Sequence, residues 1–462
     1  MAYRRYSGTA DIEIRQHREE IKQHKNEIRK LKRAYRQSRK AIPKVIRWER
    51  LDNTANLFPS IAGENTTNVY RISYTMKEEI NPILLQEALD LVLPRMDMFN
   101  VRIRRGVFWY YFEENGKPAP AISRESKYPC RFIHDNQNNS YLFQVSYYGR
   151  RINLEVFHVL ADGMGSITFL RELVYQYLRL MYPVLQEQLG DSLNSHTSLN
   201  HEDSFIRNFN KPKKEGFEKK KAFRLQLETL PPGDFGLIHG YMPISQLKDV
   251  CHKNKVSINE YLTAATIYAI YRGGMRRYKK KRPIRVAVPV NLRPFYGSIT
   301  TRNFFVMVSA EFQPEHAAHT FDEILESTVQ SLRSQIQKDR LEELFSYSVS
   351  NQENPLLRPV PLFLKNPVIK MVYQQSAYAN TTTLTNIGSL TVEDCYAPYI
   401  EGASVCLPMS AGQNIKCAVC SFGDTLTYTF STTFADTKVE EIFFTTLAEQ
   451  GINVEIETNR VF

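Results

Sequence analysis

The fold is decided by one stretch, Arg151-Ile152-Asn153-Leu154-Glu155-Val156-Phe157-His158-Val159-Leu160-Ala161-Asp162-Gly163-Met164-Gly165. Its first half alternates between apolar and polar residues, which predicts a half-buried strand. Apolar residues at helical spacing follow as far as Met181 and predict a helix, with Ser166 as its N-cap. His158 therefore stands where a strand enters a glycine-containing loop. A fold can hold a side chain rigidly at such a place while exposing it to a cavity.

The composition is that of a globular protein with two domains. The chain has 462 residues, of which 42% are hydrophobic and 24% charged. No apolar run is long enough to span a bilayer, and the N-terminus lacks the apolar segment of a secretory signal. Six cysteines without framework spacing suit a reducing compartment. These features predict a cytoplasmic protein without a transmembrane segment.

The positive charge is concentrated at the N-terminus. Residues 1–50 contain sixteen Lys or Arg and six Asp or Glu, a net of +10 out of +11 for the whole chain. Residues 11–40 are predicted to form one exposed helix with a narrow apolar stripe, suited to lying on the body or to self-association. An anionic surface is an alternative partner. Nucleic acid is disfavoured because no nucleic-acid-binding signature accompanies the charge.

The pattern of predicted strands and helices divides the whole chain into four segments. They are a basic extension at 1–44, a first α/β subdomain at 45–185, a crossover linker at 186–235 and a second α/β subdomain at 236–462. Pro289, within the predicted strand 284–293, indicates an edge or a bulge, because proline cannot donate to a ladder.

His158 has the chemistry of a general base. Its ordinary pKa, about 6.5, lets a neutral imidazole accept a proton from an attacking alcohol or amine. The chain has no Gly-x-Ser-x-Gly sequence, which disfavours a hydrolase with a serine nucleophile. Asp162 could orient the imidazole or pair with an arginine to lock the loop, and the bend at Gly163 favours locking. The alternative is an ordinary buried histidine followed by an ordinary turn.

Three motifs in order resemble one family. His158-Val159-Leu160-Ala161-Asp162-Gly163 is similar to the His-x-x-x-Asp-Gly signature of the coenzyme A-dependent acyltransferase superfamily. That superfamily includes chloramphenicol acetyltransferase, wax ester synthases and condensation domains. Pro289 to Pro294 resembles its Asn-Leu-Arg strand, and Thr385-Asn386-Ile387-Gly388 resembles a segment near the active-site channel of the wax ester synthases. Trp48 to Pro59 looks like the opening of alcohol acetyltransferase-like members.

The resemblance implies a fold and a division of roles. The expected fold is α/β, with two chloramphenicol acetyltransferase-like domains, each a mostly antiparallel sheet with helices, meeting along a central channel. His158 would be the catalytic base, Asp162 would be salt-bridged to Arg293, and Gly163 would provide the bend. Asn386 and Gly388 would belong to the substrate-binding segment, with Asn386 as a donor to the oxyanion or as a channel-lining residue. The alternative is a turn asparagine before Gly388.

The resemblance also implies the substrates. The chain lacks the carrier-protein domains of condensation modules and the Asp-Phe-Gly-Trp-Gly segment of plant enzymes. Acyl-CoA, with acetyl-CoA as the expected donor, is therefore the predicted cosubstrate, and the basic run 276–282 is a candidate for contacting its phosphates. No bound cofactor or metal is expected. The pair Cys417 and Cys420 is interpreted as core packing rather than a metal site.

Three functions remain open from the sequence. The first is an acyl-CoA-dependent O-acyltransferase that acts on a small alcohol. The second is a condensation-type enzyme or N-acyltransferase that acts on an amine, and the third is a non-catalytic relative that binds a ligand in the channel. The presence of His158, Asp162, Gly163 and Arg293 together favours an enzyme.

Overall fold

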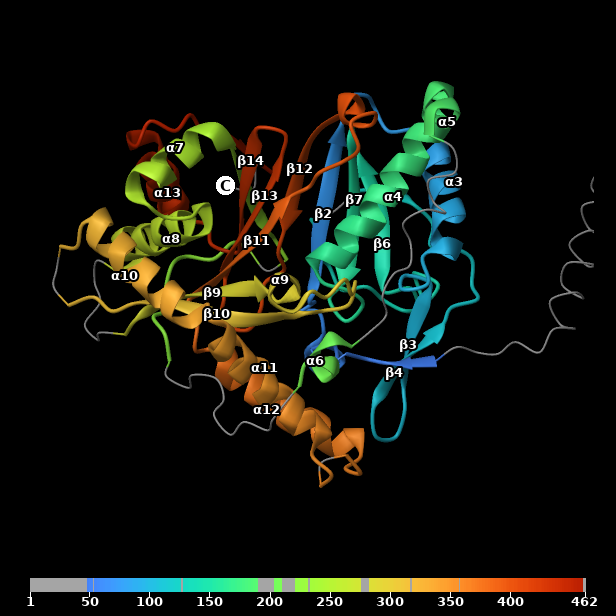
Figure 1. Ribbon diagram of the computed structural model, residues 1–462, viewed down its shortest axis with the longest axis horizontal. Helices are drawn as coiled ribbons and strands as arrows, with labels where there is room; N and C mark the ends of the chain where they lie inside the picture. The colour runs from blue at the N-terminus through green and yellow to red at the C-terminus, as the bar shows by residue number, and fades with distance from the viewer. Residues whose placement is uncertain are drawn as a thin grey trace, which may run out of the picture. The chain divides into compact units, whose positions relative to one another are not determined.

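The computed structural model describes residues 48–52, 54–125, 128–189, 203–209, 221–231, 233–275, 282–315, 318–356 and 358–459 (Figure 1). The chain divides into two units, residues 1–47 and residues 48–462. The predicted helix at 11–40 and the basic residues 276–281 lie outside the described residues, as does most of the predicted linker. All of the described residues belong to the second unit.

The first sheet carries the His158 strand at its centre. Its order is β12-β2-β7-β6-β5. Its strands are β2 (Val69–Met76), β5 (Ser123–Arg124), β6 (Phe143–Tyr148), β7 (Arg151–Phe157) and β12 (Ile400–Cys406). The β6–β7 hairpin closes at Gly149, whose φ of 54° favours glycine. Strand β12 pairs antiparallel with β2, so a strand from the last quarter of the chain completes this sheet (Figure 1).

Helices from the first half of the chain pack on this sheet. They are α2 (Phe58–Ile61), α3 (Pro82–Val92), α4 (Gly163–Met181) and α5 (Pro183–Leu189), with a short 3-10 turn at Leu93–Arg95. Asn81 caps α3 by accepting the N–H groups of Ile83 and Leu84, and Pro82 stands in the first turn, where its missing N–H costs no hydrogen bond. The apolar faces of α3 and α4 share one core with β2 and β7.

The helix after His158 begins earlier than predicted. Its N-cap is Asp162, not Ser166, and the Asp162 carboxylate accepts the N–H of Gly165 at 3.2 Å. Ser166 lies inside the first turn, where its hydroxyl is 2.6 Å from the hydroxyl of Tyr70. A carboxylate is the better cap because the positive end of the helix dipole also attracts its charge. The two motif glycines are therefore helical, not part of a flexible loop.

Strand β7 is buried on both faces, and the prediction of a half-buried strand is wrong. Asn153 and Glu155 are 0% and 2% exposed. Glu155 accepts from Arg71 and from Gln144, and Asn153 accepts from the Ser73 hydroxyl at 2.8 Å. Buried polar groups of this kind need such partners, and the neighbouring strands β2 and β6 supply them. Alternation alone does not show that a polar face lies inside the protein.

The second sheet has seven strands in the order β10-β9-β11-β13-β14-β8-β15. They are β8 (Gly236–Pro243), β9 (Ile284–Asn291), β10 (Phe305–Phe312), β11 (Thr382–Ser389), β13 (Ile415–Phe422), β14 (Thr425–Thr432) and β15 (Glu455–Thr458). The helices of this half are α6 (Ser204–Arg207), α7 (Ile244–Asn254), α8 (Ile258–Gly274), α9 (Arg293–Tyr296), α10 (Phe321–Gln335), α11 (Lys338–Glu353), α12 (Leu362–Ala377) and α13 (Lys438–Glu449), with a 3-10 turn at Ala397–Tyr399. Ser257 caps α8 in a capping box with Glu260.

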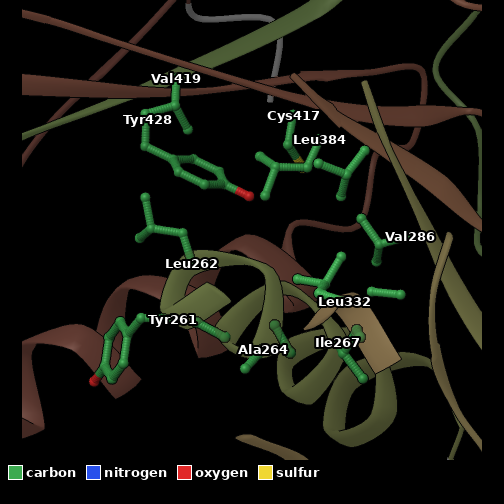
Figure 2. Close-up of a cluster of buried hydrophobic side chains, with 14 of the residues drawn as sticks. Tyr261, Leu262, Ala264, Ile267, Val286, Leu332, Leu384, Cys417, Val419 and Tyr428 are labelled. Carbon is green, nitrogen blue, oxygen red and sulfur yellow. The ribbon is translucent and has the colours of Figure 1, made fainter. Parts of the chain in front are cut away.

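The second sheet packs on both of its faces. Figure 2 shows Leu262 and Ile267 of α8 opposite Cys417 and Val419 of β13. The opposite face of β13 presents Ala418 and Cys420 to the core of the first sheet. Cys417 and Cys420 are buried, free and in different cores, which agrees with the core-packing interpretation.

Pro289 is not in an edge strand. Strand β9 lies between β10 and β11, but β11 pairs only with Val286 and Ala287. Pro289 lies beyond that pairing, so its missing N–H leaves no gap in the ladder with β11.

A small third sheet has three strands in the order β1-β4-β3. Its strands are β1 (Trp48–Arg50), β3 (Val101–Arg105) and β4 (Tyr110–Glu114). The unit is thus α/β with mostly antiparallel sheets, as predicted.

None of the helices within the described ranges is both long and apolar enough to cross a membrane. The subdomain boundaries at 185 and 236 stay a prediction, and β12 shows that the second segment also contributes to the first sheet.

Candidate active site

The imidazole of His158 is wedged between aromatic rings at the end of β7. The Phe58 ring of α2 stacks on it at 4.8 Å between centroids with an interplanar angle of 21°. The Tyr70 ring meets it edge-on at 4.9 Å. The backbone N–H of His158 donates to the Asn68 carbonyl at 2.9 Å, which continues the pairing of β7 with β2. The ring is therefore fixed in orientation while the residue stays only partly buried.

Asn303 determines which nitrogen of His158 carries the proton. Its Oδ1 lies 3.0 Å from His158 Nδ1, and its Nδ2 donates to the His158 carbonyl at 3.3 Å and to Asp52 Oδ2 at 3.1 Å. Both partners of Nδ2 are acceptors, so the orientation of the amide is set by its surroundings. Oδ1 must then accept a hydrogen bond from Nδ1–H. The other ring nitrogen, Nε2, is left with its lone pair, as a base requires.

Burial lowers the pKa of His158 below its ordinary value of 6.5. The charge of Lys416 in β13 acts in the same direction, whereas Asp162 and the bond to Asn303 oppose it. A lowered pKa keeps the imidazole neutral at pH 7. The base is therefore in its proton-accepting form without a further partner.

Asp52 accepts a hydrogen bond from the side-chain amide of Asn303. Its carboxylate also accepts the N–H of Ala55 at 2.7 Å and is 1% exposed. Burial raises the pKa of Asp52 to about 7. His158, Asn303 and Asp52 thus form a chain of hydrogen bonds that begins at the imidazole and ends in the loop before α2.

The ion pair of Asp162 and Arg293 fixes the loop that presents Asn303. Arg293 Nη1 lies 2.8 Å from Asp162 Oδ2, and both side chains are nearly buried. The guanidinium also donates to the carbonyls of Thr300 and Arg302, at 2.8 and 2.6 Å. Asp162 Oδ2 accepts the N–H of Phe304 at 3.3 Å. The pair expected from the sequence therefore joins the start of α4 to residues 300–304.

The two motif glycines allow close contacts on either side of this pair. A Cβ at Gly165 would overlap the carbonyl oxygen of Thr301. A Cβ at Gly163 would lie 3.1 Å from Cγ2 of Ile387, tighter than most such contacts. Gly163 thus meets the β11 segment that the sequence analysis assigned to the channel. No side chain larger than hydrogen fits at Gly165 without moving the 300–304 loop.

The remaining predicted residues, Asn386 and Gly388, lie at the end of β11. Asn386 Oδ1 accepts the N–H of Gly388 at 2.9 Å, which makes a local turn at the end of β11. Gly388 has a φ of 78°, a conformation that favours glycine. Within the described part of the chain, no contact joins Asn386 to His158.

A cavity of about 700 Å³ opens beside the same strand end. Its lining includes Phe157, which precedes His158, and Pro59, which follows Phe58. The β3–β4 hairpin and the 132–142 region complete it, with Ile103, Arg104, Arg105, Tyr110, Tyr111, Glu113, Phe132, Ile133, Asp135 and Leu142. Pockets for small molecules have volumes of this order and mix apolar walls with a few polar groups.

Two residues of the hydrogen-bonded chain had no assigned role in the sequence analysis. Asp52 was quoted only as part of the resemblance of 48–59, and Asn303 was not singled out. No spacing links Asn303 to His158, since 145 positions separate them. The sequence feature that marks Asn303 is its place at the end of a polar run, Thr301-Arg302-Asn303, directly before a strongly apolar strand.

The comparisons with known proteins give matches in structure only. No protein-family model matches the chain, and no curated protein matches it in sequence. TRI101 of Fusarium sporotrichioides, solved with coenzyme A and T-2, is similar at a TM-score of 0.57 and 12% identity, over 89% of this chain and 99% of its own.

Two further solved structures match over similar lengths. The TRI3 trichothecene 15-O-acetyltransferase of Fusarium sporotrichioides has a TM-score of 0.56 at 10% identity, over 88% of this chain and 97% of its own. The condensation domain of the monacolin K polyketide synthase MokA has a TM-score of 0.54 at 10% identity, again over 88% and 97%. The predicted fold, that of chloramphenicol acetyltransferase-like enzymes and condensation domains, is confirmed.

We expect Asp162→Ala to lower the free energy of unfolding by about 3 kcal/mol, because it removes a helix cap and leaves Arg293 buried without its anion. Urea denaturation followed by circular dichroism measures this change. Asp249→Ala, at an exposed position of α7, is the matched control and should change stability by less than about 0.5 kcal/mol. Equal, small effects for both variants would contradict a locking role for Asp162.

Proposed function

We propose that the protein is an acyltransferase that moves an acyl group, expected to be acetyl, from coenzyme A to an alcohol, with His158 as the general base. The observation that carries this proposal is the 3.0 Å contact between His158 Nδ1 and Asn303 Oδ1. Because Asn303 Nδ2 donates to Asp52 and to the His158 carbonyl, we infer that Nδ1 is the donor in this contact and that Nε2 keeps its lone pair. The coenzyme A-bound relative and the acetyltransferase relative share its fold, which supports the choice of donor and reaction.

The proposed reaction is a direct attack. The hydroxyl oxygen of the acceptor bonds to the thioester carbonyl carbon while its proton passes to His158 Nε2. Collapse of the tetrahedral intermediate breaks the carbon–sulfur bond, and the imidazolium returns the proton to the departing thiolate. A fixed base of this kind is worth about 10²–10⁴ in rate. No covalent intermediate on the protein is needed.

The other residues have supporting roles in this proposal. Asn303 positions the imidazole, and Asp52 positions Asn303. Asp162 and Arg293 hold the loop that carries Asn303. Asn386 is the proposed donor to the oxyanion of the intermediate, and Gly388 gives its strand end the required turn.

The cavity next to Phe157 is the proposed acceptor pocket. Its lining combines aromatic and aliphatic residues with Arg104, Arg105, Glu113 and Asp135. An acceptor that has both an apolar body and polar groups fits this lining. Amine transfer is the alternative, because condensation and epimerization domains share the fold.

The test of the proposal is a thiol-release assay with acetyl-CoA and a panel of alcohols and amines. We expect turnover with an alcohol and a loss of at least about 10²-fold in kcat for His158→Ala, since the base is removed. His252→Ala, at an exposed histidine of α7, should retain wild-type activity. Thermal unfolding of each variant shows that it is folded. Wild-type turnover by folded His158→Ala would overturn the mechanism, and no thiol release with any acceptor would count against the proposed activity.

We also expect kcat/KM to fall on the acid side with an apparent pKa below 6.5, because burial disfavours the imidazolium form. Activity is lost as the pH falls through this value, since protonated Nε2 cannot accept the acceptor proton. Asp52, with a pKa of about 7, touches Asn303 and could add a second titration. The Asp52→Asn variant separates the two and should keep the acid limb. A midpoint at or above 6.5 in that variant would contradict a lowered pKa of His158.

A further inference from the structure

Helix α12 presents an apolar face to solvent. Phe363, Leu364, Val368, Met371 and Val372 are between 53% and 64% exposed. At 100° per residue they fall on one side of the helix, since their positions span about half a turn of the helical wheel. Single exposed apolar residues are ordinary, but a contiguous face of large ones marks an interaction site.

The tip of the β3–β4 hairpin extends this face. Leu362 N–H donates to the Val107 carbonyl at 2.8 Å, and Lys365 Nζ donates to the Phe108 carbonyl at 3.1 Å. Val107, Phe108 and Trp109 are themselves exposed, and the hairpin tip lies beside the start of α12 (Figure 1). We name these two groups of exposed residues together the α12–hairpin face.

The charges around the α12–hairpin face are mostly positive. Residues 354–378 contain Arg358, Lys365 and Lys370 and no Asp or Glu. Residues 102–110 contain Arg102, Arg104 and Arg105 and likewise no acid. Glu113 of β4 approaches the hairpin arginines and pairs with Arg102 and Arg104, but Arg105 is exposed. Lys365 Nζ is held by the carbonyls of Phe108 and Arg358. The face is therefore apolar and aromatic, with Arg105, Arg358 and Lys370 as its exposed basic residues.

The charge decides between the possible occupants. Residues 1–47 carry a net charge of +10, which opposes their binding to a basic face. A second copy would bring the same basic face to itself. An anionic bilayer satisfies both properties at once, because aromatic and aliphatic side chains enter the acyl boundary while Lys and Arg meet the phosphates.

We propose that the α12–hairpin face binds the surface of an anionic lipid bilayer. Bilayer contact through this face goes beyond the acyl transfer proposed above and does not depend on it. The hairpin that contributes Phe108 and Trp109 also lines the cavity beside Phe157. Bilayer binding would therefore place one wall of that cavity at the lipid surface, where an apolar acceptor could partition.

The test is flotation of the full-length chain with vesicles of phosphatidylcholine alone and vesicles that also contain phosphatidylglycerol. We expect binding to the anionic vesicles and weaker binding at high salt, which screens the basic residues. The double variant Val368→Glu/Val372→Glu should bind roughly tenfold less, because charged side chains oppose insertion of the apolar face. Arg105→Glu/Lys370→Glu should also lose binding to the anionic vesicles.

A matched control introduces the same two negative charges at positions outside the α12–hairpin face. Ile83→Glu/Val184→Glu alters two exposed apolar residues, on α3 and α5, and should bind like the wild type. Circular dichroism melts show that each variant is folded. No flotation of the wild type, or equal binding by the face and control variants, would overturn the proposal. So would a dimer, seen by sedimentation, that is lost only in the Val368→Glu/Val372→Glu variant.

Discussion

The ion pair between Asp162 and Arg293 is the constraint on which the rest of the site depends. One carboxylate caps α4, accepts the N–H of Phe304 and neutralises a nearly buried guanidinium. The guanidinium in turn holds the carbonyls of residues 300 and 302. Because Asn303 lies between these contacts, its amide is presented to His158 by structure that the ion pair fixes. A buried charge that lost its partner would be costly, so the loop has little freedom to move.

The sequence predicted the parts of this arrangement that follow from local patterns. The strand that ends before His158 and the helix that follows it, both predicted from apolar spacing, are present as β7 and α4. It did not predict that Asp162 caps α4, because Ser166 is also a favoured N-cap residue and stands directly before the apolar residues at helical spacing. Nor did it predict that Glu155 is buried, since only long-range partners such as Arg71 reveal this. The hydrogen bond between Asn303 and His158 is another long-range contact that the sequence does not reveal.

The resemblance was informative where periodicity was not. It joined Asp162 to Arg293 across more than a hundred residues, and the structure places their charged atoms 2.8 Å apart. It also assigned Asn386 and Gly388 to a segment near the site, and the neighbouring Ile387 meets Gly163. The exposed face of α12 was not predicted at all. A helix with apolar residues on its solvent side has the same sequence signature as a buried one, so only the structure shows which face is uncovered.

The central claim is that Asn303 holds His158 as the Nδ1–H tautomer with a free Nε2. Nitrogen NMR of the labelled histidine ring tests it directly, with the signals assigned by comparison with His158→Gln. At neutral pH the account predicts a protonated Nδ1 and an Nε2 with the shift of an unprotonated nitrogen, and Asn303→Ala should shift the ring toward a mixture of tautomers. An Nε2–H tautomer, or an imidazolium at neutral pH, would contradict it.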